Sequence, residues 1–330
     1  MGTSGGEVPS ESASAIHVGP DAWEWLTAAD RSGRVGGCFR GGVNAVFGSE
    51  AVVCLQSPAV PIHPWALVAD LPWEELPEGA PVTVSRGELS IGRSVLPFEE
   101  AEVVSLTFHP PEHLVSLEEL QDRVALIEQL LAETPDPFES EFDRAFVRDR
   151  DRILSQWKET GDSQVLLALI GRGPGTTPAG DDTLIGLLAG LEALAAVAPD
   201  RAASRLQGTH YVLQAHSLPP LQATGHKPQA SSPTSTLSAQ LLASAAAGRF
   251  PFPVLEVQFA VLNRGAGMSR AVHSAGEALT VGQTTGKATL TGLVAALLGW
   301  TRAPGAHDVS FQDLPPRAHT HPQPAPQARP

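Results

Sequence analysis

The chain has 330 residues, a length that predicts two domains at roughly 100–200 residues each. Apolar residues make up 42% of the sequence and charged residues 18%, which excludes a wholly disordered chain and supplies enough apolar surface for a sizeable core. The net charge of -14 argues against nucleic acid and anionic membrane surfaces as partners, because both require clustered Lys and Arg.

Both ends of the chain predict disordered tails. Residues 1–20 are small and polar and carry no secretory signal, and residues 304–330 are rich in Pro, His and Gln. Cys38 and Cys54 are too few for a metal cage or a disulfide framework, and we expect two buried thiols. The longest apolar run, residues 184–197, is too short to span a bilayer. We therefore expect a cytoplasmic protein without a metal or another cofactor.

Residues 21–110 have the pattern of short strands. Residues 52–55 form an apolar run, residues 82–91 alternate around a glycine-containing turn, and residues 103–108 alternate again. Because no helical pattern separates these runs, the sequence predicts a β-rich domain, an antiparallel barrel or sandwich.

Helical patterns dominate residues 111–303. Ser116 and Glu119 form a capping box before a helix that ends near residues 134–137. A second amphipathic helix follows, and its apolar side is predicted to consist of Phe138, Phe142, Phe146, Ile153 and Trp157. Residues 184–197 are apolar all round and predict a buried helix, whereas 165–170 fit a helix or a strand. Further helices are expected near 202–214, 236–247, 254–262 and 289–300. The fold class is therefore α+β, with a β-rich domain followed by a mainly helical one.

A loop rich in Gly and Pro, residues 171–182, leads into the buried helix. Thr177 suits the position of the N-cap and Pro178 the first helical position. Such a junction offers free N–H groups at the positive end of a helix dipole, and these attract anions. The loop matches neither a Walker A motif nor a convincing dinucleotide-binding fingerprint.

Asp181 and Asp182 end this loop, and they are the candidate catalytic residues. The helix N-terminus favours the ionised carboxylate, which suits an acceptor for amide donors, a metal ligand or a general base. An equally open alternative is that the two residues only cap the helix.

The segment 180–189 has an internal counterpart at 286–295, with six of ten residues identical and a Thr-Thr pair before each. We infer that two related helices present their N-termini to one cleft, with the acidic pair at one mouth and Lys287 at the other. A surface position is the alternative for Lys287. The hydroxyls of Thr236 and Ser238 either cap a further helix or reach the same cleft.

These patterns define a candidate site for a small metabolite that has N–H donors beside a carboxylate or a phosphate. Its candidate substrate-binding residues are Gly173, Gly175, Thr176, Thr177, Gly180, Thr236, Ser238, Thr284, Thr285, Gly286 and Lys287.

Residues 173–182, together with segments 235–239 and 282–286, resemble the motifs of a bacterial family that includes the H subunit of oxamate carbamoyltransferase (AllH). Phe39 and Asn44 resemble a weaker pattern of that family, so that the resemblance extends over roughly residues 30–300. Four positions in or next to two of these segments depart from the usual motifs of the family. Thr176 and Ala179 replace Leu and Ser, Gln283 replaces His, and Lys287 stands in place of an Asp.

The resemblance implies a subunit of a carbamoyltransferase complex in allantoin and purine breakdown, with other subunits as partners. The implied reaction moves a carbamoyl group between oxalurate and phosphate and gives oxamate and carbamoyl phosphate. Whether this chain is itself an enzyme stays open. The alternatives are a non-catalytic subunit that binds a metabolite or acts as a scaffold, and a metal-dependent enzyme that uses Asp181 and Asp182.

Overall fold

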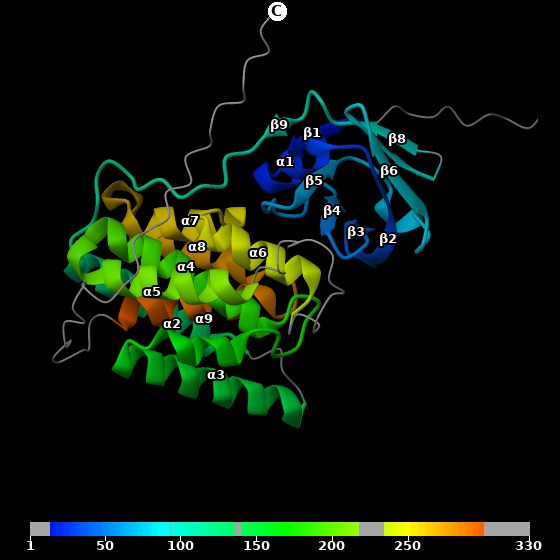
Figure 1. Cartoon of the computed structure of the whole chain (residues 1–330). Coiled ribbons are helices and arrows are strands. Elements are labelled where there is room, and N and C mark those ends of the chain that lie inside the picture. Colours follow the sequence, from blue (N-terminus) through cyan, green and yellow to red (C-terminus); the bar gives the residue numbers. More distant parts are fainter. Residues whose placement is uncertain (1–13, 93, 136–139, 218–233, 300–330) are drawn as a thin grey trace, which may run out of the picture.

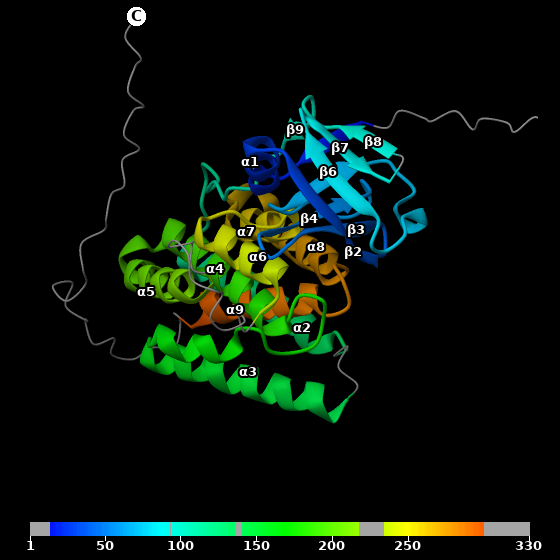
Figure 2. The same cartoon turned by 45° about the vertical axis from the view of Figure 1, so that its right-hand side comes forward.

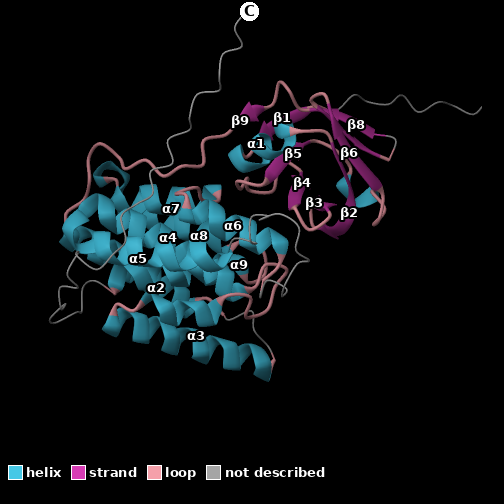
Figure 3. Cartoon of the chain, viewed as in Figure 1, coloured by secondary structure: helices cyan, strands magenta, loops and turns pink. Residues whose placement is uncertain are grey.

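The computed structural model describes residues 14–92, 94–135, 140–217 and 234–299. Strands fill the N-terminal part and helices the C-terminal part, as Figure 1 and Figure 3 show. The predicted α+β class is therefore confirmed. Among the described helices, none combines the length and the apolar character that a membrane crossing requires. The predicted boundaries at residues 110 and 303 stay predictions.

The N-terminal part is a curled nine-stranded sheet, open like a half-barrel, with the order β8-β7-β6-β2-β3-β4-β5-β1-β9. Neighbouring strands are antiparallel except in the pairs β4–β5 and β1–β9. The strands are β1 (Ala15–Val18), β2 (Arg31–Phe39), β3 (Gly42–Phe47), β4 (Ala51–Gln56), β5 (Ala66–Ala69), β6 (Pro81–Ser85), β7 (Glu88–Ile91), β8 (Ser94–Pro97) and β9 (Glu102–Val103). A 3₁₀ helix spans Trp73–Glu75.

Period-two patterns account for much of this sheet. In β6 and β7 the buried side chains alternate with more exposed ones, and the turn between these strands places Arg86 and Gly87 at φ 50° and 75°. The hairpin predicted over residues 82–91 is thus confirmed. The alternation predicted over residues 103–108 gives only the two-residue strand β9 and an isolated bridge at Thr107.

Order begins earlier than the composition predicts. The expected N-terminal tail overlaps β1 and the start of helix α1 (Pro20–Ala28), so that this prediction is wrong for residues 15–20. Val18 is fully buried and β1 pairs with β5 and β9, which explains why a polar segment is ordered. The predicted tail residues 1–13 and 304–330 lie outside the described residues.

The C-terminal part packs its helices around one large apolar cluster. The helices are α2 (Leu117–Glu133), α3 (Glu141–Thr160), α4 (Ala179–Val197), α5 (Pro199–Ser217), α6 (Thr236–Ala246), α7 (Phe252–Leu262), α8 (Gly267–Leu279) and α9 (Thr285–Leu298), with 3₁₀ helices at Ser163–Leu169 and Arg264–Ala266. In Figures 1 and 2 α3 lies along the lower edge of this part.

Local signals place α2 correctly and α3 in part. Ser116 caps α2 by accepting a hydrogen bond from the backbone N–H of Glu119 at 3.1 Å, which confirms the predicted N-cap. On α3, Phe146, Ile153 and Trp157 are buried, but Phe142 is 75% exposed, so the expected apolar side is wrong there. Phe138 lies outside the described residues. Helix α8 was not predicted, because the side chains that it buries are small, namely Ala271, Ser274, Ala275 and Ala278, and no large apolar residues mark its inner face.

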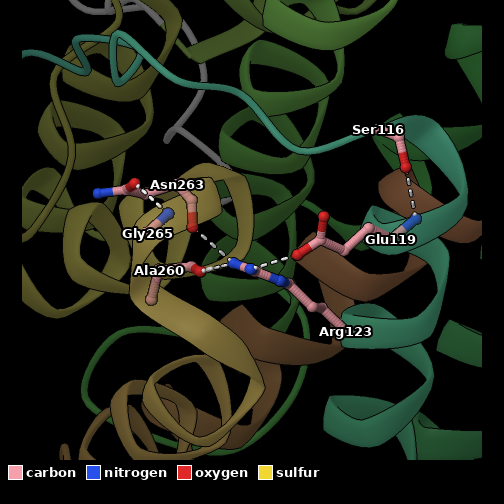
Figure 4. Close-up of polar contacts among 6 residues, drawn as sticks. All are labelled: Ser116, Glu119, Arg123, Ala260, Asn263 and Gly265. Atoms are coloured by element: carbon pink, nitrogen blue, oxygen red, sulfur yellow. Dashed lines mark hydrogen bonds and ion pairs between the residues drawn. The ribbon is translucent and has the colours of Figure 1, made fainter.

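A buried arginine fastens α2 to the end of α7. Arg123 donates to the carbonyl oxygens of Ala260 and Asn263 at 2.7 and 2.8 Å, and to the Glu119 carboxylate at 2.7 Å (Figure 4). The two carbonyls belong to the C-terminal turn of α7, whose groups lack partners within the helix. The Asn263 carbonyl also accepts from the N–H of Ala266, so the guanidinium matters most for the carbonyl of Ala260.

A polar contact joins the sheet part to the helical part. Asp21 on α1 forms an ion pair with Arg249 at 2.6 Å and accepts a hydrogen bond from the hydroxyl of Ser244 on α6. Trp65 donates to the same hydroxyl at 3.2 Å. Burial raises the pKa of Asp21, whereas the charge of Arg249 lowers it. The contact fixes α6, and with it one wall of the candidate site, against the sheet.

Candidate functional site

Helices α4 and α9 cross in close contact at two equivalent glycines. A Cβ atom at Gly186 would lie 1.8 Å from the carbonyl oxygen of Thr289, and one at Gly292 would lie 1.9 Å from that of Thr183. Since Thr183 corresponds to Thr289 in the internal repeat, the contact is reciprocal. At their N-terminal ends, the hydroxyl oxygens of Thr177 and Thr285 are 3.4 Å apart. The inferred meeting of the two N-termini is thus observed.

Both helices begin elsewhere than the sequence predicts. Pro178, not Thr177, is the N-cap of α4, and Ala179 is the first helical residue. Helix α9 begins at Thr285, four residues before the expected start, with Thr284 as its N-cap. Proline suits a helix start, because it has no N–H group and a fixed φ. Because Thr177 is not the N-cap, its hydroxyl is available for another contact.

Asp182 lies between the two helix N-termini and is 2% exposed. The Thr177 hydroxyl donates to its Oδ2 at 3.1 Å, and the Thr285 hydroxyl also stabilises its charge. Burial nevertheless raises the pKa of Asp182 to about 7. The expectation that Asp182 is ionised is therefore wrong at acidic pH. Burial raises its pKa by more than the hydrogen bonds from the two hydroxyls lower it. A carboxyl with this pKa exchanges its proton near neutral pH, as a general acid or base must.

Asp181 has a different surrounding and is fully buried. Its Oδ1 accepts a hydrogen bond from the Gly171 N–H at 2.8 Å, and its Oδ2 accepts one from the hydroxyl of Thr234. Burial raises its pKa, and these two donors oppose the rise. Asp181 therefore ties the start of the glycine loop to the segment that leads into α6. Thr234 was not among the predicted site residues, and its one signal in the sequence is its place directly before the cap of α6.

The two predicted residues of α6 lie beside this contact. Ser235 is the N-cap and accepts a hydrogen bond from the Ser238 N–H at 3.2 Å, whereas Thr236 is the first helical residue and is half-buried. The Ser238 hydroxyl is buried close to Asp181, whose pKa it helps to lower, without ideal hydrogen-bond geometry. Three helix N-termini, those of α4, α6 and α9, thus meet around the two aspartates.

The glycine loop reaches the surface above the aspartates. Gly173 and Gly175 have φ values of 95° and 112°, which favour glycine, and Cβ atoms there would lie 2.9 Å from the Phe146 ring and 2.8 Å from the Thr284 hydroxyl. The N–H groups of residues 173 and 175–177 donate to no other described residue. Since Gly175 and Thr176 are exposed, these groups can bind an anion.

Two other predicted binding glycines are in packed surroundings. A Cβ atom at Gly180 would lie 2.1 Å from the Leu169 carbonyl oxygen, and one at Gly286 would lie 2.1 Å from that of Ala278. Close backbone approach explains why glycine stands at both positions. Gly180 therefore serves the packing of α4 on the 3₁₀ helix at Ser163–Leu169 and Gly286 that of α9 on α8, whereas Gly173 and Gly175 shape the loop.

Lys287 does not face the aspartates. Its Nζ donates to the carbonyl oxygen of Thr134 at 2.6 Å, and the cavity that it lines lies between α2, α3 and α9 and includes neither Asp181 nor Asp182. The expected cleft with acid at one mouth and Lys287 at the other is therefore wrong. The first turn of α9 points the lysine away from the aspartates, a direction that depends on where the helix starts.

Within the described ranges, no group of three or more His, Cys, Asp or Glu side chains is placed to hold a metal ion. The thiols are also distinct from the candidate site. Cys54 is buried and donates to the Asn44 side-chain oxygen at 3.2 Å, but Cys38 is exposed, so the expectation of two buried thiols is wrong for Cys38.

Fold and site together define a mixed α+β protein with a glycine loop that is hydrogen-bonded to two buried aspartates. The aspartates lie where the N-termini of three helices come together. The model of the family described as oxamate carbamoyltransferase subunit AllH matches residues 169–297. The resemblance to this family is thus confirmed over that part, which contains the loop, α4, α6 and nearly all of α9. Neither a curated protein nor a solved structure matches the chain significantly.

Proposed function

We propose that this chain is a subunit of an oxamate carbamoyltransferase-type complex and that its glycine loop binds an anionic, amide-bearing metabolite. The observation that carries the proposal is the position of the family match, which includes every residue of the loop and of the aspartate pair. The complex would transfer a carbamoyl group between oxalurate and phosphate, as part of allantoin breakdown.

The loop and the two threonine pairs have the chemistry that such ligands need. Carboxylate and phosphate oxygens accept hydrogen bonds from N–H groups at residues 173–177, where the helix dipoles of α4 and α9 add positive potential. Hydroxyls of Thr176 and Thr284 donate to or accept from the same ligand. The candidate binding residues Thr177 and Thr285 instead hold Asp182.

The transfer itself balances without a cofactor. A phosphate oxygen attacks the carbamoyl carbon of oxalurate, the bond from that carbon to the oxamate nitrogen breaks, and this nitrogen takes up the proton of the phosphate. Asp182, with a pKa of about 7, is suited to pass that proton. N–H groups of the loop stabilise the negative charge that develops on the carbonyl oxygen.

Binding by the whole chain tests this proposal. We expect oxamate, oxalurate, phosphate or carbamoyl phosphate to bind saturably in isothermal titration calorimetry. Gly175→Ala places a Cβ atom 2.6 Å from the Thr177 carbonyl oxygen and should weaken binding by about tenfold or more. Gly79→Ala is the matched control, because Gly79 has a similar φ of 81° and open space around it. Equal affinity of the two variants would count against the loop as the site.

A non-catalytic subunit is the second candidate, and the burial of the aspartates favours it. Asp181 and Asp182 are 0% and 2% exposed and accept hydrogen bonds from their own chain. In this case, Asp182→Asn leaves the carbamoyl transfer of the reconstituted complex unchanged. A large loss of activity in a folded, assembled Asp182→Asn complex would support the catalytic proposal instead.

A further inference from the structure

The cavity that Lys287 lines has a volume of about 440 Å³ and lies between α2, α3 and α9, outside the aspartate pair. Its walls are residues at helical spacing: 147, 151, 154 and 158 on α3, and 287, 291, 294 and 298 on α9, with the end of α2 between them. Helix α3 packs mainly on the 3₁₀ helix at Ser163–Leu169 and touches α9 only sparsely, which leaves the groove open. A volume of this size is typical of small-molecule sites.

Cationic side chains gather in this groove although the chain is strongly acidic. Of the three lysines in the sequence, Lys158 and Lys287 line the cavity, together with Arg150. Two carboxylates, Glu128 and Asp151, also line it, but Asp151 is already bound by Arg150 at 2.8 Å. The cations therefore outnumber the acids in a protein with a net charge of -14.

Two of these cations have unused donors. Arg150 is 5% exposed, and its Nη1 is buried without a hydrogen-bond partner among the residues that the structure describes. No ion pair joins the Lys158 ammonium group to an acidic residue in the described ranges. A buried guanidinium N–H without an acceptor is unfavourable, so an acceptor that enters the groove forms a charge-assisted hydrogen bond there.

Apolar side chains form the rest of the wall, namely Leu131, Val147, Leu154, Val294 and Leu298. Inorganic ions gain nothing from such a wall, whereas an organic anion buries apolar surface against it. We propose that the groove between α2, α3 and α9 binds a small organic anion, with its carboxylate or phosphate at Lys158 and Arg150 and its apolar body against α3 and α9. This site is separate from the glycine loop and does not depend on the proposed function.

The test titrates the full chain with hexanoate, hexyl phosphate and uncharged hexan-1-ol, which share one apolar body, by ligand-observed NMR. We expect saturable binding of at least one of the two anions, and the one that binds more tightly identifies the head group. Lys158→Gln should weaken anion binding at least about fivefold. Arg152→Gln is the matched control, because it removes one charge from an exposed side chain of the same helix that does not line the groove.

A second variant tests whether the groove is the binding site without changing any charge. Thr291→Phe fills the groove and should abolish binding, while circular dichroism confirms the fold. Gly175→Ala should leave binding at this groove unchanged, which separates the result from that at the glycine loop. The proposal is overturned if neither anion saturates up to about 10 mM, if hexan-1-ol binds as tightly, or if Lys158→Gln and Arg152→Gln bind alike.

Discussion

Replacing Asp182 by asparagine should change how the stability of the chain depends on pH. A neutral carboxyl tolerates burial, whereas the ionised form carries the cost of desolvation. Burial raises the pKa of Asp182 from the ordinary value of 3.8 to about 7. The folded state therefore retains the proton longer than the unfolded state, and its stability falls as the pH rises through this interval.

The magnitude follows from the size of the pKa change. At ~1.4 kcal/mol for each pH unit, the ionised Asp182 destabilises the fold by about 4 kcal/mol at alkaline pH. Roughly 2.5–3 kcal/mol of this falls between pH 5 and pH 8. Asp21, whose pKa is also raised, remains in the variant and cancels in the difference, whereas the charge of Asp181 acts on Asp182, so the difference reports the titration of the aspartate pair.

Urea unfolding followed by far-ultraviolet circular dichroism measures the effect at several pH values. The free energy of unfolding of Asp182→Asn, minus that of the wild type, should increase by roughly 2.5–3 kcal/mol from pH 5 to pH 8. Asp200→Asn is the control, because Asp200 lies in the first turn of α5 but is exposed. The reasoning fails if the difference for Asp182→Asn stays constant over this range, or if the control changes as much.

Three further perturbations test the packing. Gly292→Ala forces α4 and α9 apart and should lower the free energy of unfolding by about 1–3 kcal/mol, whereas Gly276→Ala, in open space on α8, should raise it by up to ~1 kcal/mol. Arg123→Ala removes the buried donor to the Ala260 carbonyl, whereas the Asn263 carbonyl keeps the N–H of Ala266, and should cost about 3 kcal/mol in the same assay; an effect below ~1 kcal/mol would contradict the role of the arginine. Cys38 should react with a thiol reagent in the native protein, but Cys54, whose pKa burial raises to about 12, only after unfolding; equal rates would refute this.

Local signals in the sequence predict much of the fold. The Ser116 cap, the hairpin at 82–91 and the apolar run at 184–197 each depend on neighbours in the chain, and the structure has all three. Strand β1 was not predicted, because its order depends on partners far away in the sequence, and helix α8 was not predicted, because it buries only small side chains. The expected burial of Phe142 was wrong for a related reason, since helical spacing does not say where the contact of a long helix ends.

The sequence predicts candidate residues for the site but not its geometry, and whether these residues bind a ligand stays a prediction. The repeat led correctly to the meeting of α4 and α9, because similar segments pack in similar ways. The direction of Lys287 and the raised pKa of Asp182 could not be predicted, because the first depends on the exact helix start and the second on burial from several elements. Thr234 lacks any pattern of its own and is known as a partner of Asp181 only from the structure.

The reciprocal contact of α4 and α9 has a consequence for how such a sequence can vary. Each of Gly186 and Gly292 is fitted to the carbonyl of a threonine on the other helix, so a larger residue at either position changes the docking surface of both. Because both contacts are with backbone atoms, they restrict the two glycine positions and not the identity of the two threonines. In related sequences, glycine should therefore be retained at both positions of the repeat, even where the surrounding residues of the two halves diverge.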